Sequence, residues 1–391
     1  MTKQTRNYQI CSRCILDTVD DPAIVFDSPG VCNHCLTYDQ MSNQRLRKGE
    51  GREEKLESLL KDIRATGRGR DYDCVVGVSG GVDSTYVALL AKSFGLRVLA
   101  VHCDNGWNSE LAVMNIENIV KRLDYDLFTY VINWEEFRNL QLSYLKASVV
   151  DIEAVTDHAI IATLYKVAAQ HGAKYILSGD NMATEGILPP HWVHNKNDLV
   201  NIKAIHRRFG SIPLKTFPTL GFTKNLYFQR VRGIKYVPIL DCVDYVKEDA
   251  KRIIIEELGW RDYGGKHYES IFTRFYQSYI LPAKFHIDKR KSHLSTLICS
   301  GQMTREEALE MIKAAIVNQD VLVADKEYVI KKFGLTPASF EAIMQSPIKN
   351  HTDYPSITKV YRRLRPVYRK LKPFIKVTRD IQHRPLDSVA E

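Results

Sequence analysis

The stretch VVGVSGGVDSTYVALL, residues 75–90, places glycines and serines between an apolar run and what reads as the first turns of a helix. A strand, turn and helix of this kind can hold a phosphate, present a serine nucleophile or only turn the chain. A Walker A loop needs a lysine and then Ser or Thr directly after its last glycine. Here Val82 and Asp83 follow Gly81. The sequence therefore excludes a Walker A loop.

Residues 77–81 (GVSGG) satisfy the G-x-S-x-G pattern of a nucleophile elbow, in which Ser79 would be the nucleophile. A hydrolase of that type also needs an acid and a later histidine, and His158 and His267 are candidates. The pattern is short, and chance matches to it are common. The hydrolase interpretation is therefore kept as a distant alternative.

The longer string SGGVDST favours a phosphate site. Gly80 and Gly81 let backbone N–H groups approach phosphate oxygens, while Ser79 and Ser84 add hydroxyl donors. The helix N-terminus that follows supplies partial positive charge. Asp83 can orient a Mg²⁺ ion bound to the same phosphates. In this interpretation Ser79 binds phosphate and is not a nucleophile.

Two Cys-x-x-Cys pairs near the N-terminus, CSRC and CNHC, are separated by 17 residues. Each pair places two sulfurs on one tight turn, and two such turns can close a tetrahedron around Zn²⁺. A site of four cysteines has no open position, which predicts a structural role. A redox dithiol or unconnected cysteines are the alternatives, and His34 is expected to be a bystander. The predicted zinc ligands are Cys11, Cys14, Cys32 and Cys35.

Short apolar runs alternate with helical patterns from residue 72 onward. The predicted strands are DCVVGV, LRVLAVHC, DLFTYVIN and AKYILSGD; the predicted helices are YVALLAKSF, LAVMNIENIVKRL and DHAIIATLYKVAAQHG. This alternation predicts an α/β fold with a doubly wound parallel sheet. The segments GVSGG, HCDNG and LSGDN all follow strands, where such sheets bind ligands.

The chain is predicted to have four regions. Residues 1–40 form a zinc-binding ribbon, 41–70 a linker helix, 71–245 the α/β domain, and 246–391 a helical C-terminal region with a basic tail. In the last region Thr304 and Glu307 predict a capping box. Thr336 with Pro337 predicts another helix start.

The formal net charge of +9 is unevenly distributed. No acidic residue occurs between Asp198 and Asp241 or between Asp353 and Asp380, although both stretches are rich in Lys and Arg. This suits an anionic partner, with solvated basic loops as the alternative. No apolar run is long enough to span a bilayer, and the N-terminus MTKQTRNYQI lacks the apolar core of a secretory signal. We therefore expect a cytoplasmic chain without a transmembrane segment.

SGGVDS resembles the loop of the N-type ATP pyrophosphatases, the PP-loop superfamily, and two later segments agree. HCDNG (102–106) falls where the family contacts adenosine, and SGDNMATEG (178–186) resembles a later loop of its NAD synthetase-like members. The resemblance implies ATP and Mg²⁺ as cofactors. It implies that Asp104, Gly179, Asn181 and Glu185 face the nucleotide or its metal, with Mg²⁺ at Asp83 and Glu185.

The zinc segment and SGGVDS, joined to residues 260–312, resemble the N-acetyl sugar amidotransferase family of lipopolysaccharide and flagellar sugar pathways. The resemblance covers about residues 8–312. It implies that the acetamido oxygen of an acidic, UDP-linked N-acetyl sugar is adenylylated, and that ammonia displaces AMP to give an acetamidino group. Ammonia would come from separate subunits that resemble a glutaminase and a cyclase.

For the acceptor we expect Lys266 and His267 near the phosphates or the activated oxygen, and Arg274 on a sugar carboxylate. Asp157 and His158 begin a helix and either cap it or line the acceptor pocket. The alternative is that the first three residues stabilise a helical hairpin against the core.

A tRNA-thiolating enzyme is the strongest rival, because that class also joins zinc segments to SGGxDS loops and needs basic surface. Its chemistry often uses paired cysteines near the site, whereas Cys242 and Cys299 are isolated in this sequence. We therefore do not expect nucleic acid as a partner.

Overall fold

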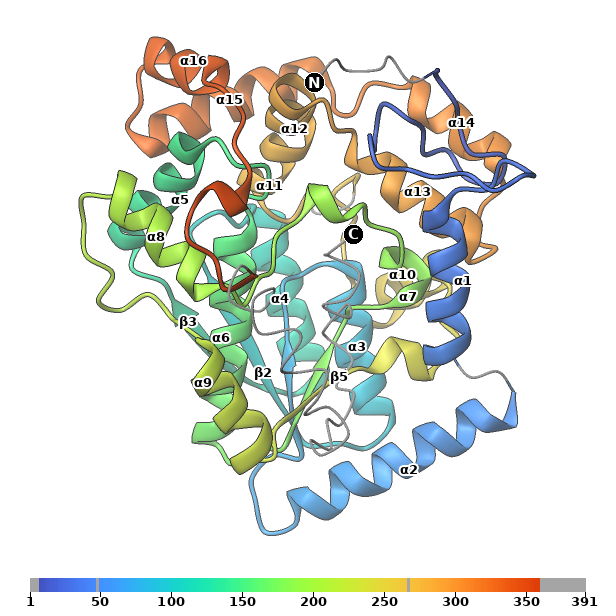
Figure 1. Cartoon of the computed structure of the whole chain (residues 1–391). Coiled ribbons are helices and arrows are strands. Elements are labelled where there is room, and N and C mark those ends of the chain that lie inside the picture. Colours follow the sequence, from blue (N-terminus) through green and yellow to red (C-terminus); the bar gives the residue numbers. More distant parts are fainter. Residues whose placement is uncertain (1–6, 47–48, 266–267, 359–391) are drawn as a thin grey trace, which may run out of the picture.

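The structure is a computed structural model that describes residues 7–46, 49–265 and 268–358 (Figure 1). Its centre is a five-stranded sheet with the order β3-β2-β1-β4-β5, in which every pair of neighbours is parallel. This confirms the predicted doubly wound α/β fold. The strands are β1 (Cys74–Gly77), β2 (Val98–Asp104), β3 (Asp126–Val131), β4 (Tyr175–Ser178) and β5 (Lys235–Pro238).

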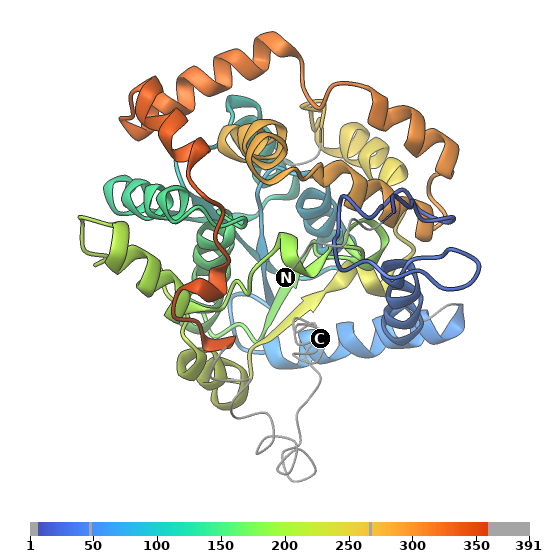
Figure 2. The ribbon, with the colours of Figure 1, turned by 45° about the horizontal axis from the view of Figure 1, so that its top comes forward.

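Helices cover both faces of the sheet. Alternate residues of a strand point to opposite faces, so Val76 packs with α3 (Val82–Ser93), α4 (Glu110–Leu123) and α10 (Lys247–Leu258). Its neighbour Val75 packs on the other face with α6 (Ala154–Gln170). The long helix α2 (Glu50–Gly67) runs below the first layer and buries Leu60 and Ile63 in it (Figure 2).

The strand order reverses between β1 and β4. The chain moves outward from β1 to β2 and β3, then returns to β4 on the other side of β1. Loops that leave the carboxyl ends of β1 and β4 therefore diverge, and the space between them is where doubly wound sheets bind ligands. The SGGVDS loop follows β1 and the SGDN segment follows β4, so both border this point.

The chain beyond β5 is helical where it is described. After α10 come α11 (Ile271–Phe275), α12 (Leu281–Phe285), α13 (Lys289–Cys299), α14 (Arg305–Lys313), α15 (Gln319–Phe333) and α16 (Pro337–Gln345). The predicted capping box of Thr304 and Glu307 is present, and Thr336 caps α16 with Pro337 in its first turn. Helices α11, α12, α15 and α16 share a core with α5 (Trp134–Ala147) above the carboxyl edge of the sheet, whereas α13 and α14 pack together around Leu294, Ala308 and Ile15 of the N-terminal segment.

Shorter helices connect these layers. They are α7 (Met182–Glu185), α8 (Leu199–Phe209), α9 (Phe222–Leu226), the π-helical turns Tyr227–Val231 and Tyr276–Ile280, and the 3-10 turns Pro190–Trp192, Ile239–Cys242 and His351–Asp353. No helix among the described residues is long and apolar enough to cross a membrane.

The N-terminal segment contains isolated bridges and no extended strands in its described part. Ile10 pairs with Asp17, and Phe26 pairs with Cys32. Helix α1 (Asn33–Arg45) starts inside the second cysteine pair, because Cys32 is its N-cap residue. The predicted linker helix is therefore two pieces: the end of α1, and α2.

Candidate active site and metal centre

The SGGVDS loop leaves the start of α3 open. Gly81 is the N-cap residue, and within the described ranges no side chain caps the helix, so the first-turn N–H groups have no side-chain cap there. Ser79 Oγ lies 3.1 Å from Ser84 Oγ and accepts a hydrogen bond from Gly81 N at 3.3 Å. An open helix N-terminus with hydroxyl donors beside it is a suitable cradle for phosphate.

Gly80 is required by both its conformation and its surroundings. Its φ is +81°, and a Cβ atom would lie 2.7 Å from the Ala112 carbonyl oxygen. Trp260 Nε1 donates to the Gly80 carbonyl at 2.8 Å from the opposite side. The loop is therefore fixed between α4 and the segment after α10, in a shape that a larger residue would disrupt.

A nucleophile elbow would need a histidine base beside Ser79, and the described residues place none there. Within the described parts of the chain, the hydrogen bonds of Ser79 Oγ go to Ser84 and Gly81 and none goes to a histidine. His158 is fully buried in the core, and His267 lies outside the described residues.

Gly179 brings the loop after β4 against the start of α3. A Cβ atom on Gly179 would lie 3.0 Å from Asp83 Cβ and 3.1 Å from Ser84 N. Asn181 is buried; its amide donates to the Gly179 carbonyl at 3.0 Å and its Oδ1 accepts from Thr184 N at 2.8 Å. Gly179 and Asn181 were predicted to contact the nucleotide, and in the structure they shape the loop after β4.

Carboxylates gather beside this loop. Tyr245 OH donates a short hydrogen bond to Asp83 Oδ1. Burial and then the Asp83 charge raise the pKa of Tyr245, and Glu185 contributes in the same direction. Burial and then Glu185 raise the pKa of Asp180 to about 6, although Asp180 stays accessible to solvent.

The residues predicted for Mg²⁺ fit that ion in number and type. Mg²⁺ is commonly held by one or two carboxylates together with substrate phosphates and water. Asp83 lies in the first turn of α3. Glu185 acts electrostatically on Tyr245, which is the hydrogen-bond partner of Asp83. The two would hold Mg²⁺ against phosphates that lie on the loop.

Three residues of the later chain also reach the loop, and the sequence motifs did not identify their roles. Trp260 bonds Gly80, as described above, and Tyr263 OH and Glu269 Oε1 both lie 3.3 Å from the position that a Cβ on Gly81 would take. They belong to the WRDYGG…YES stretch, whose aromatic residues were the available signal.

The start of the helical region is paired with the loop after β2. Asn108 forms an antiparallel bridge with Ser270. Ser109 N donates to the Glu269 carbonyl at 2.8 Å, and Ile271 N donates to the Trp107 carbonyl at 2.9 Å. The helices after residue 269 are therefore held at the carboxyl edge of the sheet by backbone pairing.

Charged side chains gather around Lys196 near the start of α6. Lys196 Nζ lies 2.7 Å from Asp151 Oδ2 and 3.0 Å from Asp157 Oδ2. Burial alone would lower the pKa of Lys196, but Asp151 and Asp157 outweigh it and raise that pKa. Asp157, a predicted acceptor residue, is thus solvent-accessible and close enough to Asp180 to raise the pKa of that carboxyl.

The other predicted acceptor residues are placed differently. His158 Nδ1 donates to the Lys196 carbonyl at 2.7 Å, and its Nε2 accepts from Leu220 N at 3.1 Å. Burial lowers its pKa, so it is a neutral residue that positions the loop carrying Lys196. Arg274 Nε and Nη2 both bond Asp325, each at 2.7 Å. The side chains of His158 and Arg274 are therefore both engaged by other parts of the protein.

Lys266 and His267 lie outside the described residues, so their predicted roles stay predictions.

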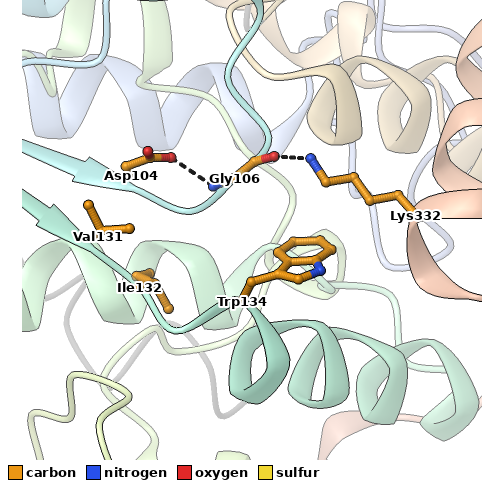
Figure 3. Close-up of a pocket in the computed structure, with 6 residues that line it drawn as sticks. All are labelled: Asp104, Gly106, Val131, Ile132, Trp134 and Lys332. Carbon is orange, nitrogen blue, oxygen red and sulfur yellow. Dashed lines mark hydrogen bonds between the residues drawn. The ribbon is translucent and has the colours of Figure 1, made fainter.

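Asp104 lies in a separate pocket at the ends of β2 and β3, with a volume of about 200 Å³ (Figure 3). Its carboxylate accepts a hydrogen bond from Gly106 N at 2.8 Å. Lys332 of α15 bonds the Gly106 carbonyl, and its ammonium lies 4.6 Å from the Trp107 ring centroid. The adenosine contact predicted for Asp104 stays a prediction.

The four N-terminal cysteines converge. Their sulfur atoms all lie within 4.8 Å of one another, with Cys11–Cys35 at 3.9 Å and Cys14–Cys32 and Cys32–Cys35 at 3.7 Å. Four thiolates placed about 2.3 Å from a tetrahedral Zn²⁺ would be about 3.8 Å apart. The cluster therefore fits zinc. His34 bonds Asp21 at 2.7 Å.

Cys299, which is isolated in sequence, places its Sγ 3.5 Å from Cys35 Sγ at the end of α13. It is therefore a fifth thiol at the edge of the cluster.

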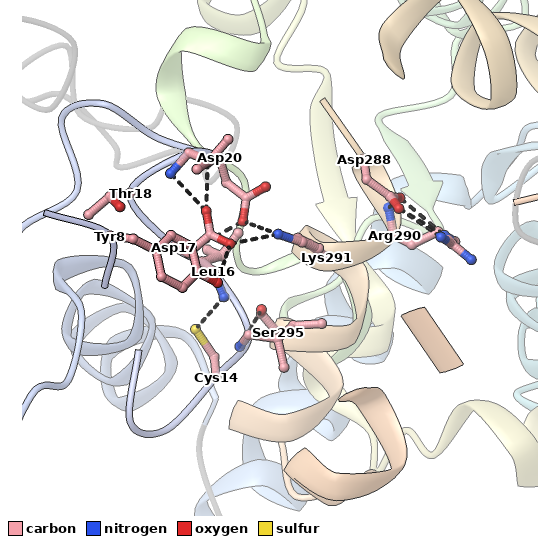
Figure 4. Close-up of polar contacts among 12 residues, drawn as sticks. Tyr8, Cys14, Leu16, Asp17, Thr18, Asp20, Asp288, Arg290, Lys291 and Ser295 are labelled. Atoms are coloured by element: carbon pink, nitrogen blue, oxygen red, sulfur yellow. Dashed lines mark hydrogen bonds and ion pairs between the residues drawn. The ribbon is translucent and has the colours of Figure 1, made fainter. Parts of the chain in front are cut away.

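The cysteine segment is fastened to the C-terminal helices. Lys291 of α13 lies 2.8 Å from carboxylate oxygens of both Asp17 and Asp20 (Figure 4). Ile15 N donates to Ser295 Oγ at 3.4 Å, and Arg305 of α14 bonds the carbonyls of two zinc-candidate cysteines. The first and last thirds of the chain thus share one interface.

Comparison with known families gives two matches along the chain. Residues 54–188 match the family NAD synthase. Residues 269–367 match the family described as LPS biosynthesis protein WbpG-like, C-terminal domain.

Individual relatives match short stretches of the chain. The chain is 38% identical over 76 residues to a GMP synthase [glutamine-hydrolyzing] of Pyrobaculum aerophilum, which is 19% of this chain and 15% of that protein. It is 30% identical over 110 residues to tRNA(Ile)-lysidine synthase of Thermus thermophilus, covering 28% of this chain and 20% of that one. The matches thus span a fifth or less of these relatives. NMN synthetase from Francisella tularensis aligns with 76% of this chain and 98% of its own at 13% identity and a TM-score of 0.30.

Proposed function

We propose that this chain belongs to the N-type ATP pyrophosphatase superfamily and groups through its WbpG-like domain with the N-acetyl sugar amidotransferases. From this premise, it converts an acetamido group to an acetamidino group. The substrate class is an acidic, UDP-linked N-acetyl sugar of surface glycan biosynthesis. The observation that carries the proposal concerns the segment that opens the WbpG-like region, Glu269–Ile271. Its backbone pairs with the loop after β2, and the Glu269 side chain lies beside Gly81 of the phosphate loop.

The chemistry needs two steps because an amide is a poor electrophile. First the acetamido oxygen attacks the α-phosphorus of ATP, and pyrophosphate leaves. Ammonia then forms a C–N bond to the activated carbon, and the C–O bond breaks so that AMP leaves with the original oxygen. One proton is lost from the attacking nitrogen, and the product is an amidinium.

The loop and its neighbours have distinct tasks in this scheme. Ser79, Ser84 and the open start of α3 would bind the leaving pyrophosphate. Bound Mg²⁺ would neutralise charge on those phosphates, and Asp83 and Glu185 are the side chains that would hold it. Tyr245 orients Asp83 for this task.

The ammonia source is proposed to be a separate glutaminase with a cyclase-like partner. The GMP synthase relative is named as glutamine-hydrolyzing, and the match to it spans 15% of that protein. Free ammonium should replace the partner in an assay of this chain alone.

The test is incubation with Mg-ATP, ammonium chloride and a UDP-linked diacetamido uronic acid. We expect AMP and a sugar product lighter by the difference between an oxygen atom and an NH group, measured by mass spectrometry. Asp83→Ala should abolish both products. Near-normal turnover of that variant would contradict the assignment of the phosphate loop.

An enzyme acting on RNA is the second candidate, favoured by the match to tRNA(Ile)-lysidine synthase. It predicts AMP formation that depends on tRNA and not on the nucleotide sugar. It also predicts binding that weakens steeply with salt. Both can be measured with the same preparation.

A further inference from the structure

We propose that Glu153 is the base that accepts the proton lost by the attacking ammonia, and that Lys289 is the positioning residue that keeps this carboxylate ionised. This inference rests on the proposed function. It concerns two residues, Glu153 and Lys289, to which the sequence motifs assign no role.

Only one oxygen of the Glu153 carboxylate forms a hydrogen bond with the described residues. Its Oε2 accepts a hydrogen bond from Thr273 Oγ1 at 2.7 Å. Its Oε1 is buried and has no hydrogen-bond partner among the residues that the structure describes. Leaving a buried carboxylate oxygen unsatisfied is costly, so such a group points to a ligand or a catalytic task. Glu153 also precedes α6 without capping it, so helix capping does not explain its position.

Lys289 is the matching group of opposite charge. Within the described residues its ammonium forms no hydrogen bond or ion pair, yet it interacts electrostatically with Asp151, Asp157 and Glu153. Burial and then the nearby Lys196 lower its pKa. Glu153 and Lys289 thus carry opposite charges and act on each other electrostatically, while no hydrogen bond joins them among the described residues.

A series of contacts leads from Glu153 to the phosphate loop. Thr273 Oγ1 also bonds Ser270 Oγ at 3.0 Å, and Ser270 bridges Asn108. Asn108 bonds His102 Nε2 at 2.9 Å, and His102 Nδ1 donates to the Val78 carbonyl at 2.9 Å, directly before the loop. The base and the nucleotide site are thus mounted on one hydrogen-bonded frame.

The pKa of the Glu153 carboxyl lies near neutral pH, because opposing interactions act on it. Burial and then Asp157 raise its pKa to about 7, while Thr273, Lys289 and Lys196 act in the opposite direction. The Tyr276 phenol of the following π-helical turn also interacts with Glu153, and Asp151 lies on the other side of the network as an ion-pair partner of Lys196. A base whose pKa lies near the working pH accepts a proton and releases it again efficiently.

The step is balanced as follows. Ammonia donates its lone pair to the activated carbon, the C–O bond to AMP breaks, and AMP takes that electron pair. Glu153 Oε1 takes one proton from the new C–N nitrogen and later returns it to water. No oxidant or further reactant is needed.

The test separates the two half-reactions. In Glu153→Gln, we expect ammonia-dependent amidine formation to fall at least about 100-fold, as loss of a general base implies. Exchange of labelled pyrophosphate into ATP, dependent on the UDP-linked diacetamido uronic acid, should stay within a few-fold of wild type. Equal loss of both reactions would overturn the base role. If wild type shows no such exchange, the proposed function fails, and this proposal fails with it.

Lys289 provides a second readout that a purely structural role would not move. With rates expressed per free ammonia, amidine formation should rise with pH as Glu153 ionises. Lys289→Met should shift this rise to higher pH, because the carboxylate loses a stabilising charge, and Lys289→Arg should restore it. An unchanged pH profile in a folded Lys289→Met protein would overturn the assignment.

Discussion

Asp83 and Tyr245 form a contact between side chains 162 residues apart in sequence. Asp83 could be singled out from sequence because SGGVDS is a local motif in which spacing fixes the chemistry. Tyr245 and Trp260 could not, because each reaches the loop only through packing of the later chain. The same limit affected Arg274, whose two bonds to Asp325 depend on where α15 packs.

Tyr245→Phe should separate orientation of Asp83 from its charge. We expect the apparent affinity for Mg²⁺ in ATP turnover to fall about tenfold, because one charge-assisted hydrogen bond is worth about 1.5 kcal/mol. Tyr125→Phe is the matched control, because its buried hydroxyl donates to Ala88 of the same helix at 3.0 Å. A Mg²⁺ titration in which both variants behave alike would contradict the role of Tyr245.

At the scale of elements, α3 and the loop after β4 meet at Gly179. The alternation of apolar runs predicted β1, β2, β3 and β4 and the helices between them. The strands β1, β2 and β4 are largely buried and read as continuous apolar runs, whereas β3 is a more exposed edge strand. It did not predict the strand order. That order depends on which edges pair, and it decides that β1 and β4 enclose the site.

Gly179→Ala should push this loop away from α3. The added methyl group would lie 3.0–3.1 Å from Asp83 Cβ and Ser84 N. We expect weaker ATP binding by calorimetry, by about tenfold or more, with a smaller loss in the free energy of unfolding. Gly221→Ala is the control, since its methyl group would meet only the flexible Leu199 side chain, at 3.2 Å. Unchanged ATP affinity would mean that the loop adapts.

At the scale of the whole molecule, the cysteine cluster fastens the N-terminal segment to α13 and α14. The two Cys-x-x-Cys pairs predicted the four ligands, because the spacing is local. The interface formed by Lys291 and Arg305 was beyond prediction, since these side chains come from more than 270 residues further along the chain. The placement of Cys299 belongs to the same long-range packing.

Removal of metal should therefore loosen helices distant in sequence. After treatment with a strong chelator, we expect faster amide hydrogen exchange in α13 and α14 as well as in residues 10–35, with β1 and β2 little affected. Metal binding supplies folding free energy to small cysteine-rich segments, and its loss should lower the melting temperature. Exchange confined to residues 10–35 would show that the interface survives without metal.

The backbone pairing of Asn108 with Ser270 has a consequence for how such a protein can be cut or recombined. The two family matches, 54–188 and 269–367, look like exchangeable parts when they are read along the chain. In space, the opening residues of the second part complete the loop after β2 in the first. A hybrid that joins this ATP-binding part to a foreign acceptor region would need to supply a replacement strand for that loop, or lose the frame on which the nucleotide site is mounted.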